Sequence, residues 1–239
     1  MSKIRVSAVS YTNSIPFAYG LKHSSIIDKI DLSFDVPSDC AQKLIDDKAD
    51  IGLVPVAALL KIPGYKIISD YCIGANGAVN SVFIFSNKPI ETIESLQLDP
   101  QSRTSNNLAK VLLRNYWKVT PDYTNEKADA FVEIGDRTFG KLNKYPFVYD
   151  LAEEWKKFTG LPFVFAVWAS NKILPKEFIV EFNAALKLGI ENIPQIVADL
   201  PQPDNFDLYD YLTSKLDYSL DESKILALEK FFSYLKLEG

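Results

Sequence analysis

The chain has 239 residues and a net charge of −5; 47% of its residues are hydrophobic and 24% are charged. This length allows one large domain or two smaller ones, and the composition is typical of a globular protein with a sizeable core. The acidic balance, together with the lack of any run of Lys or Arg, argues against a general affinity for nucleic acid or for an anionic membrane surface.

Few local features indicate another class of protein. The two cysteines, Cys40 and Cys72, form no C-x-x-C pair and are expected to be buried, reduced thiols. The chain begins without an apolar signal segment, and no stretch approaches the ~18 apolar residues of a membrane span, so we expect a cytoplasmic protein. The single histidine, His23, is expected at the exposed end of a short helix. Because a serine or cysteine triad and most zinc sites would need it, we expect chemistry without imidazole.

The first part of the chain predicts alternating strands and helices. Apolar and polar residues alternate from Ile4 to Ala8, which predicts a strand. Five polar side chains, S-Y-T-N-S, follow at 10–14, where an α/β sheet would place a ligand, although a solvated loop is the simpler interpretation. Further on we expect helices over 17–22, 38–48 and 56–60, and strands over 30–36, 50–56, 65–73 and 79–85.

From Ser86 the pattern starts again. The remaining chain after Trp168 predicts only helices, because apolar residues recur there at helical spacing, and Pro194 should break or kink the first of them. We expect a short helix over 89–96, a helix from the S-R-T-S stretch to 117, a strand over 129–134, a helix over 151–158, a strand over 163–168, and tail helices over 175–200, 207–216 and 221–237.

A weak internal symmetry predicts two similar α/β lobes. In each half a strand is followed by a polar loop and then by a helix. The helix leads to a second strand, which ends in Pro55 in the stretch 50–55 and in Gly135-Asp136 in the stretch 129–136. If the polar strand ends face each other, a ligand would bind between the lobes. We therefore predict lobe 1 over 1–86 plus 166–239, with the tail helices packed on it, and lobe 2 over 87–165.

The stretch S-R-T-S at 102–105 is the best candidate for an anion site. Thr104 or Ser105 can cap the following helix, which leaves backbone N–H groups near the positive end of the helix dipole. Arg103 can hold a carboxylate through two hydrogen bonds. The pattern is not specific, because an ordinary helix cap followed by an exposed arginine also explains it.

For each of three other polar residues, both a role in ligand binding and a purely structural role explain the sequence. Asn13 can exchange hydrogen bonds with a ligand hydroxyl, but a lone asparagine more often forms an Asx turn. Ser81, in an otherwise apolar strand, either bonds to the backbone or points into a cleft. Asp136 either contacts a ligand or caps a helix that begins at Arg137. The sequence contains neither a phosphate-binding loop nor G-x-G-x-x-G.

Six motifs occur along the chain, in this order: S-Y-T-N-S-I-P-F, D-I-G-L-V-P-V, I-G-A-N-G-A-V-N-S-V, L-D-P-Q-S-R-T-S, I-G-D and T-G-L-P-F-V-F-A-V-W. Together, in order and in spacing, they resemble the chorismate dehydratases of menaquinone biosynthesis, from Ile4 to about Trp168. Each motif alone would be weak, whereas the ordered set is specific. Thr12 stands where an apolar residue is expected, and Arg137 stands where many members carry a small residue.

The resemblance implies a fold and a reaction. The fold is that of the type II periplasmic solute-binding proteins, with two α/β lobes, an interlobe cleft and a helical C-terminal tail. The reaction is that of a hydro-lyase, which removes water from chorismate to give 3-[(1-carboxyvinyl)oxy]benzoate at the first step of the futalosine route to menaquinone. The resemblance implies neither a cofactor nor a metal ion, places the enzyme in the cytoplasm and allows a homodimer.

The resemblance also implies the site residues. Asn13 and Ser81 are expected to be catalytic, Asn13 by holding the ring or the leaving hydroxyl and Ser81 by orienting a carboxylate or that hydroxyl. Since no imidazole lies in these motifs, we expect the enolpyruvyl carboxylate of the substrate to take the proton from ring carbon C3, while the protein positions the groups. The expected substrate-binding residues are Ser10, Tyr11, Pro55, Asn80, Ser102, Arg103, Thr104, Ser105, Gly135 and Asp136.

Three alternatives stay open at this point. A binding protein of the same fold would hold a small carboxylate without converting it, but such proteins are normally exported. The sister enzyme of the pathway, 1,4-dihydroxy-6-naphthoate synthase, is expected to carry a histidine in its cleft, and His23 lies in the wrong motif. An effector-binding domain of a regulator is the third alternative, although no helix-turn-helix segment precedes the lobes.

Overall fold

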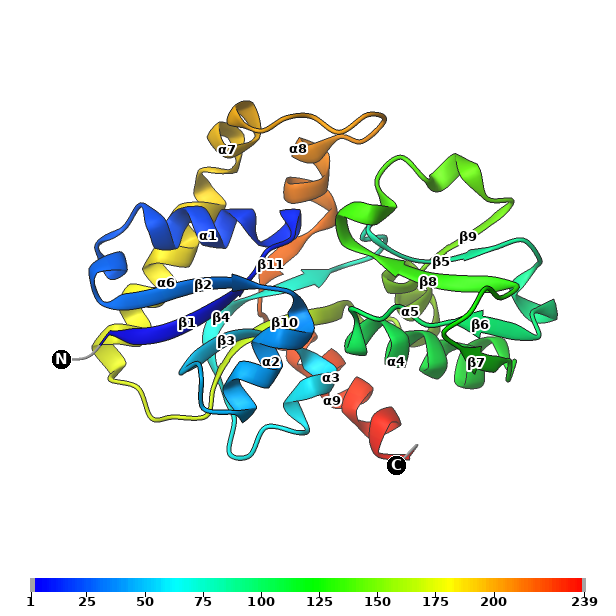
Figure 1. The fold of residues 1–239 in the computed structure, drawn as a ribbon, viewed down its shortest axis with the longest axis horizontal. Helices are drawn as coiled ribbons and strands as arrows, with labels where there is room; N and C mark the ends of the chain where they lie inside the picture. The colour runs from blue at the N-terminus through cyan, green and yellow to red at the C-terminus, as the bar shows by residue number, and fades with distance from the viewer. Residues whose placement is uncertain (1–2, 238–239) are drawn as a thin grey trace. The chain divides into compact units, whose positions relative to one another are not determined.

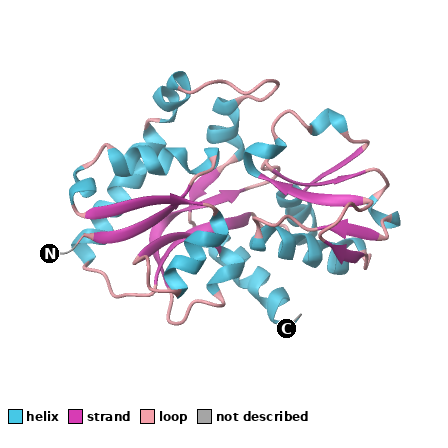
Figure 2. Ribbon diagram, in the orientation of Figure 1, coloured by secondary structure: helices cyan, strands magenta, loops and turns pink. Residues whose placement is uncertain are grey.

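The computed structural model describes residues 3–237, which form two compact units. Figure 2 shows that each unit contains strands with helices packed against them, which confirms the prediction of an α/β protein. Within the described residues, the first unit contains 3–74, 164–201 and 217–221, and the second contains 75–163, 202–216 and 222–237.

The first unit is built on a six-stranded sheet with the strand order β11-β4-β10-β3-β1-β2 (Figure 1). β1 is parallel to both β2 and β3, whereas β10 is antiparallel to β3 and β11 is antiparallel to β4. The carboxyl ends of β1 and β3 therefore lie at the same edge of the sheet. The strands are β1 (Ile4–Val9), β2 (Ile30–Asp35), β3 (Ile51–Pro55), β4 (Lys66–Ala75), β10 (Phe163–Ser170) and β11 (Asp217–Ser219).

Helices cover both faces of this sheet, with α1 and α6 together on one face and α2 on the other (Figure 1). The predicted break at Pro194 is confirmed, because α6 ends at Glu191 and Pro194 lies in the first turn of α7. Proline is tolerated there since the first N–H groups of a helix have no partner within it. The helices are α1 (Ile15–Lys22), α2 (Pro37–Ile45), α3 (Val56–Leu59), α6 (Lys176–Glu191) and α7 (Ile193–Asp199).

Two glycines allow α1 and α6 to cross with their backbones in contact. A Cβ atom added to Gly20 would lie 1.9 Å from the carbonyl oxygen of Ala185, and one added to Gly189 would lie 1.7 Å from that of Pro16. No real Cβ atom tolerates such distances, so the approach of the two helices requires glycine at both positions. The crossing positions α1, and with it the polar turn that precedes α1.

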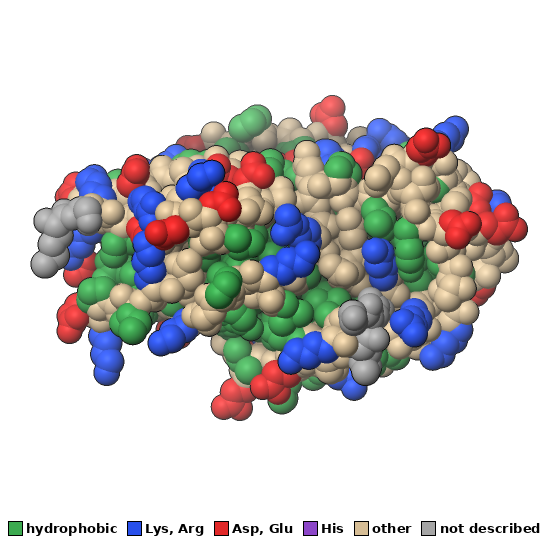
Figure 3. All heavy atoms as spheres, turned by 60° about the horizontal axis from the view of Figure 1, so that its bottom comes forward, with side chains coloured by type: hydrophobic (Ala, Val, Ile, Leu, Met, Phe, Trp, Pro, Cys, Tyr) green, Lys and Arg blue, Asp and Glu red, His purple; other side chains and the backbone are tan. Residues whose placement is uncertain are grey.

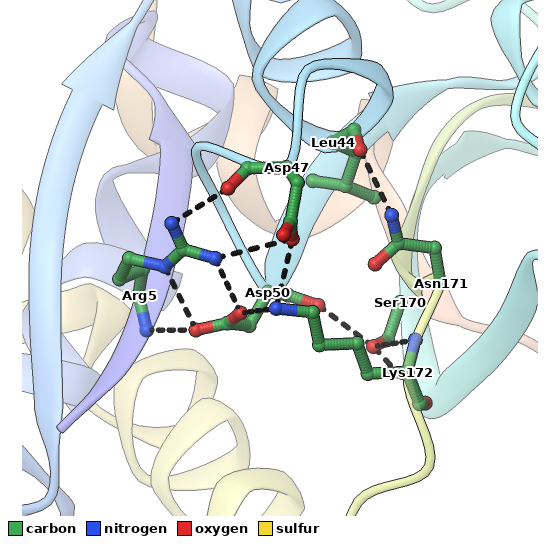
Figure 4. Close-up of polar contacts among 7 residues, drawn as sticks. All are labelled: Arg5, Leu44, Asp47, Asp50, Ser170, Asn171 and Lys172. Carbon is green, nitrogen blue, oxygen red and sulfur yellow. Dashed lines mark hydrogen bonds and ion pairs between the residues drawn. The ribbon is translucent and has the colours of Figure 1, made fainter. Parts of the chain in front are cut away.

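A network of ion pairs closes the amino edge of the first sheet (Figure 4). Asp50, just before β3, accepts hydrogen bonds from the backbone N–H of Arg5 at 2.8 Å and from its guanidinium at 2.8 and 3.1 Å. Lys172, just after β10, lies 2.5 Å from Asp50 and 2.8 Å from Asp47. The Ser170 hydroxyl donates to the Asp50 carbonyl at 2.7 Å. The network thus joins the three strands β1, β3 and β10 at the edge opposite the polar turn.

The second unit is built on a five-stranded sheet with the strand order β7-β6-β8-β5-β9. β6 is parallel to β7 and β8, whereas β5 is antiparallel to β8 and β9. The end of β6, the end of β8 and the beginning of β5 therefore meet at one edge of the sheet. The strands are β5 (Val82–Ser86), β6 (Ser95–Gln97), β7 (Asp122–Thr124), β8 (Ala130–Ile134) and β9 (Phe147–Asp150).

The core of the second unit forms around Trp155, which is fully buried on α5. Its ring contacts Phe163 and Phe231 edge-on, with ring centroids 5.4 and 6.0 Å away. Phe231 belongs to α9, so the last helix packs on this unit. The helices are α4 (Arg103–Leu112), continued by a π-helical turn (Leu113–Trp117), α5 (Leu151–Thr159), α8 (Leu208–Asp210), continued by a π-helical turn (Tyr211–Lys215), and α9 (Glu222–Leu237).

The two units differ from the predicted lobes in three longer segments and in residues 164–165, which were expected in lobe 2 but belong to the first unit. Residues 75–86 were expected in lobe 1, but β5 pairs with β8 and β9 and belongs to the second unit. Residues 202–216 and 222–237 of the tail also belong to the second unit. Their long-range packing, such as the contact of Phe231 with Trp155, decides the assignment, and the spacing of apolar residues along a helix does not reveal it.

Short strands account for the errors in the element prediction. The predicted helix over 89–96 is a 3₁₀ turn (Ile90–Thr92) followed by β6. The tail, predicted as helices only, contributes β11, and the predicted pattern also lacked β7 and β9. Three or four residues are too few to display a period of two, so pairing with neighbouring strands, and not local sequence, makes these segments strands.

Acidic and basic side chains are interspersed over the face that Figure 3 shows. A search of the described residues finds no helix long and apolar enough to cross a membrane.

Replacing Gly189 by alanine is expected to destabilise the protein, although alanine is the better helix former by about 1 kcal/mol. The new methyl group would collide with the backbone of Pro16, so the two helices must separate, and we expect the free energy of unfolding to fall by about 2 kcal/mol. Urea unfolding measures this change. Ala184→Gly, on the exposed side of the same helix, shows the propensity effect alone. A variant as stable as the wild type would mean that the crossing is not tight.

Replacing Asp50 by asparagine is expected to lower the free energy of unfolding at neutral pH by about 1 kcal/mol, because charge-assisted hydrogen bonds are lost. The hydrogen bond from Arg5 holds the pKa of Asp50 well below its usual range. A depressed pKa in the folded state stabilises the protein above the unfolded-state pKa of about 4 and loses this effect as the pH falls. The difference between the two proteins should therefore shrink between about pH 4 and pH 2.

Urea unfolding at several pH values tests this prediction. The matched control is Asp46→Asn, which removes a carboxylate from an exposed pair with Lys48 and should change stability far less. A difference between wild type and Asp50→Asn that stays constant as the pH falls would contradict the proposed role of the ionised carboxylate.

Candidate functional site

The polar turn after β1 is held by its own serine. The Ser14 hydroxyl is buried, bonds to the carbonyl oxygen of Val9, and lies 2.9 Å from that of Tyr11. Ser14 therefore shapes the turn, because the proton of its hydroxyl group is directed to backbone carbonyls. The residues between, Thr12–Ser14, form one 3₁₀ turn that leads into α1. This geometry fixes the backbone on both sides of Asn13.

Asn13 combines a fixed backbone with an unused side-chain oxygen. Its carbonyl oxygen accepts a hydrogen bond of 3.0 Å from the Tyr218 hydroxyl, and the Tyr218 ring contacts Phe17 edge-on at 5.2 Å. Its Oδ1 atom is buried but has no hydrogen-bond partner among residues 3–237. Buried polar atoms are nearly always paired, which makes Asn13 Oδ1 a candidate for a ligand contact, although three further buried side-chain atoms of the described residues are also unpaired.

Ser10, Tyr11 and Pro55 lie at the same edge of the first sheet as Asn13. Pro55 is the last residue of β3 and is buried. Ser10 and Tyr11 line an open cavity of about 350 Å³ together with His23, whereas Asn13 and Pro55 do not line it. His23 ends α1 as predicted, is exposed, and places Nδ1 2.8 Å from the Tyr19 carbonyl oxygen.

In the second unit, Asn80 and Ser81 stand at the sheet edge where β5 begins. The N–H of Gly135, just after β8, donates to the Ser81 carbonyl at 2.8 Å, which places I-G-D next to Ser81. The Ser81 side chain is buried, and its hydroxyl oxygen accepts a hydrogen bond of 2.9 Å from Tyr211. Asn80 adopts a left-handed conformation, with φ of 58°, which asparagine tolerates better than most residues.

Asp150 holds the backbone at this edge of the sheet through hydrogen bonds. The sequence interpretation did not include Asp150 among the site residues. Its carboxylate accepts the N–H of Asn80 at 2.7 Å and caps α5 by accepting the N–H groups of Ala152 and Glu153. Burial raises the pKa of Asp150 to about 6, against the effect of these backbone donors. The D-L-A-E stretch is a helix-start signal that could have revealed the cap, but not the bond to Asn80.

The S-R-T-S stretch forms the start of α4, as predicted, but a different residue caps the helix. Ser102 is the N-cap, and its hydroxyl accepts the N–H of Ser105 at 3.1 Å. The prediction that Thr104 or Ser105 caps the helix is wrong, because the helix begins at Arg103 and both residues are buried in its first turn. The side chain of Arg103 is partly exposed and forms no ion pair within the described residues.

The turn before this helix is anchored by a buried carboxylate. The Asp99 side chain is fully buried and lies 2.6 Å from Nη2 of Arg137. Asn106 also bonds to the backbone of Asp99, with 2.9 Å to its N–H and 2.7 Å to its carbonyl oxygen. Arg137, the departure from the family pattern, therefore has a structural contact of its own. It ties the loop after β8 to the start of α4.

Gly135 and Asp136 form the first residues of a 3₁₀ turn, Gly135–Thr138, directly after β8. Gly135 is buried and has φ of 65°, a conformation that favours glycine. The N-cap of the turn is Ile134, so the interpretation of Asp136 as a helix cap is wrong. The Asp136 side chain is exposed at this edge.

The structure thus brings the predicted residues together in two clusters, one in each unit. The first contains Ser10, Tyr11, Asn13 and Pro55, and the second contains Asn80, Ser81, the 102–105 stretch, Gly135 and Asp136. Both clusters consist mainly of hydrogen-bond donors and acceptors, with Arg103 as a cation that forms no ion pair among residues 3–237. Among the described residues, no three His, Cys, Asp or Glu side chains gather as a metal ion would require.

Solved structures show which fold this is. A protein from Archaeoglobus fulgidus has a TM-score of 0.73 at 16% identity, over 99% of this chain and 98% of that one. The periplasmic aliphatic sulphonate binding protein of Escherichia coli has a TM-score of 0.62 at 16% identity, over 100% of this chain and 87% of that one. At these identities the likeness concerns the fold alone, and it confirms the predicted fold, which is like that of periplasmic binding proteins.

Sequence comparison shows the family. The chain is 29% identical to the chorismate dehydratase of Campylobacter jejuni, over 95% of this chain and 96% of that protein. It is 24% identical to the chorismate dehydratase of Thermus thermophilus, over 78% of this chain and 77% of that protein. A family model described as menaquinone biosynthesis matches residues 4–237. Because this match spans nearly the whole sequence, the chain belongs to the menaquinone biosynthesis family.

Proposed function

We propose that this protein is a chorismate dehydratase, which converts chorismate to 3-[(1-carboxyvinyl)oxy]benzoate and water. The observation that carries the proposal is the similarity, over 95% of the chain, to the chorismate dehydratase of Campylobacter jejuni. Two clusters of hydrogen-bonding groups suit this reaction, which needs well-placed donors more than strong bases. His23 lines the cavity beside Ser10 and Tyr11, so its part in the reaction needs a separate test. We place the reaction in the futalosine route and the enzyme in the cytoplasm.

The chemistry is a simple elimination. The C–H bond at ring carbon C3 and the C–O bond at C4 break, and the electron pair of the C–H bond becomes a new ring double bond. The proton passes to the enolpyruvyl carboxylate of the substrate and then to the departing hydroxide, so one water leaves and nothing is oxidised or reduced. Because the product is aromatic, the protein's main task is to hold the groups in a reactive arrangement.

Asn13 is proposed to hold the departing hydroxyl group. Its buried Oδ1, which has no partner in the described part of the chain, can accept the hydrogen of the C4 hydroxyl. Its amide N–H₂ can donate to the oxygen as negative charge develops there. Tyr218 donates to the backbone carbonyl of Asn13 and so fixes the backbone from which the amide extends. Ser10, Tyr11 and Pro55 are proposed to complete this part of the site.

The second cluster is proposed to bind the carboxylates of the dianionic substrate. The Arg103 guanidinium forms no ion pair with any described residue and can hold a carboxylate through two hydrogen bonds. It lies in the first turn of α4, where the helix dipole adds partial positive charge. Ser81 is proposed to donate to the carboxylate that takes the proton. Asn80, the other residues at 102–105, Gly135 and Asp136 are proposed to complete this part of the site.

The wild-type protein is expected to convert chorismate without any added cofactor. Incubation with chorismate should yield an aromatic product that is lighter by one water, measured by ultraviolet absorption and mass spectrometry. A folded protein that returns chorismate unchanged would contradict the proposed activity. If it nevertheless retained chorismate in equilibrium dialysis, it would be a binding protein of the same fold.

Asn13→Ala is expected to lower kcat about 100-fold, because a donor to developing charge is worth about 3 kcal/mol of barrier. Stability should hardly change, since Oδ1 has no partner to lose. Steady-state kinetics and urea unfolding measure both quantities. Asn192→Ala, which removes an amide bonded to the Leu188 carbonyl, is the matched control and should leave kcat unchanged.

His23→Ala tests the proton acceptor in the same assay, and its activity should equal that of the wild type. Turnover by Asn13→Ala close to the wild-type rate would remove Asn13 from the mechanism. A large loss in His23→Ala would contradict proton transfer to the substrate's own carboxylate.

A further inference from the structure

We infer that Tyr211, from the C-terminal part of the chain, is a positioning residue that sets Ser81 as a hydrogen-bond donor to the substrate. The inference rests on the proposed function and adds a residue that no sequence motif contains. Tyr211 and Ser81 both belong to the second unit, although 130 positions separate them in the sequence.

The Tyr211 and Ser81 side chains are joined by a hydrogen bond between their hydroxyl groups. The Tyr211 hydroxyl lies 2.9 Å from Ser81 Oγ, and both residues are buried, with 1% and 2% of their surface exposed. A phenol is the more acidic of the two groups and therefore the better donor. Burial also raises the pKa of Tyr211, so the phenol keeps its proton at neutral pH.

The Ser81 hydroxyl group keeps a proton that it can donate to a ligand. A hydroxyl group has one proton to donate and two lone pairs to accept with. If Ser81 accepts from Tyr211, its own proton is left over, and Ser81 Oγ has no other hydrogen-bond partner within residues 3–237. The phenol therefore converts Ser81 from a hydroxyl that could rotate freely into one whose proton is directed away from Tyr211, toward a ligand acceptor.

The backbone around Ser81 is held on both sides by hydrogen bonds. The N–H of Gly135 donates to the Ser81 carbonyl at 2.8 Å, and the preceding N–H, that of Asn80, is held by Asp150 at 2.7 Å. The rotation of the Ser81 hydroxyl is thus the remaining freedom at this point, and Tyr211 removes it. This freedom matters because a donor fixed in advance stabilises charge at no cost of reorientation.

The segment that carries Tyr211 is itself locked to the loop after β8. The Phe139 and Phe206 rings are stacked with centroids 3.7 Å apart, and each contacts the Tyr211 ring, at 5.5 and 5.1 Å. A Cβ atom on Gly140 would lie 3.1 Å from the Asp204 carbonyl oxygen, so the backbones also approach closely. The loop that carries Gly135 and Asp136 and the segment that carries Tyr211 therefore form one packed layer.

Tyr211→Phe removes only the phenol oxygen and tests the inference in the full-length protein. We expect kcat for chorismate to fall about tenfold, less than for the loss of a direct donor, while KM changes less than about twofold. Tyr149→Phe, which removes a phenol that accepts the N–H of Ile90, is the matched control and should leave kcat unchanged. Urea unfolding checks that both variants are folded.

The deciding measurement is a double-mutant cycle with Ser81→Ala. If Tyr211 acts only through Ser81, then Tyr211→Phe has no further effect on kcat in the Ser81→Ala background. If the phenol had a merely structural role, the losses of kcat caused by Tyr211→Phe and by Ser81→Ala would multiply in the double variant. Phe206→Leu, which keeps the phenol but loosens its packing, is a second variant should Tyr211→Phe not fold. Its smaller loss of kcat should likewise vanish in the Ser81→Ala background.

The outcomes distinguish this inference from the proposed function. An active wild type together with a Tyr211→Phe variant of unchanged kcat, or with multiplying effects, overturns the role of Tyr211 and leaves the dehydratase activity intact. A folded wild type that does not convert chorismate overturns both.

Discussion

Two buried phenols from the C-terminal part of the chain hold the two residues on which the proposed chemistry depends. Tyr218 donates to the Asn13 carbonyl in the first unit, and Tyr211 donates to the Ser81 hydroxyl in the second. Because burial of an unpaired phenol is costly, each hydrogen bond stabilises the fold and orients the site at once. In both units a strand end supplies a polar residue, and a segment distant in the sequence fixes the backbone of Asn13 in one case and the side chain of Ser81 in the other.

In the first unit the ion network and the candidate residue Asn13 lie at opposite edges of the sheet. At the amino edge, Arg5, Asp50 and Lys172 satisfy one another in a dense ion network, and on one face the glycines of α1 and α6 allow close packing. At the carboxyl edge, Asn13 keeps a buried oxygen without a partner in the described chain. An unsatisfied buried acceptor lowers stability, and the proposed contact with the substrate would satisfy the one on Asn13.

The two clusters contain groups that position charge and few groups that could act as a base. The pKa of Asp150 is raised to about 6, but its carboxylate is buried and occupied by backbone N–H groups, which makes it a support for Asn80. His23 is exposed and bonded to its own helix. Such an arrangement favours a reaction in which the substrate supplies the proton acceptor and the product gains aromatic stability. Preorganised donors then carry the protein's contribution to the rate.

By itself the sequence determined the α/β class, the family, the long strands and helices, and the break at Pro194, because these depend on local periodicity and on ordered motifs. The candidate residues Asn13, Ser81 and 102–105 came from those motifs too. Only the tertiary structure decided that Ser102 caps α4, that Asp150 supports Asn80, and that the tail is divided between the units, with β11 in the first and α9 in the second. The physical reason is that short strands and buried partners are chosen by contacts between residues far apart in the chain, which leave no period in the sequence.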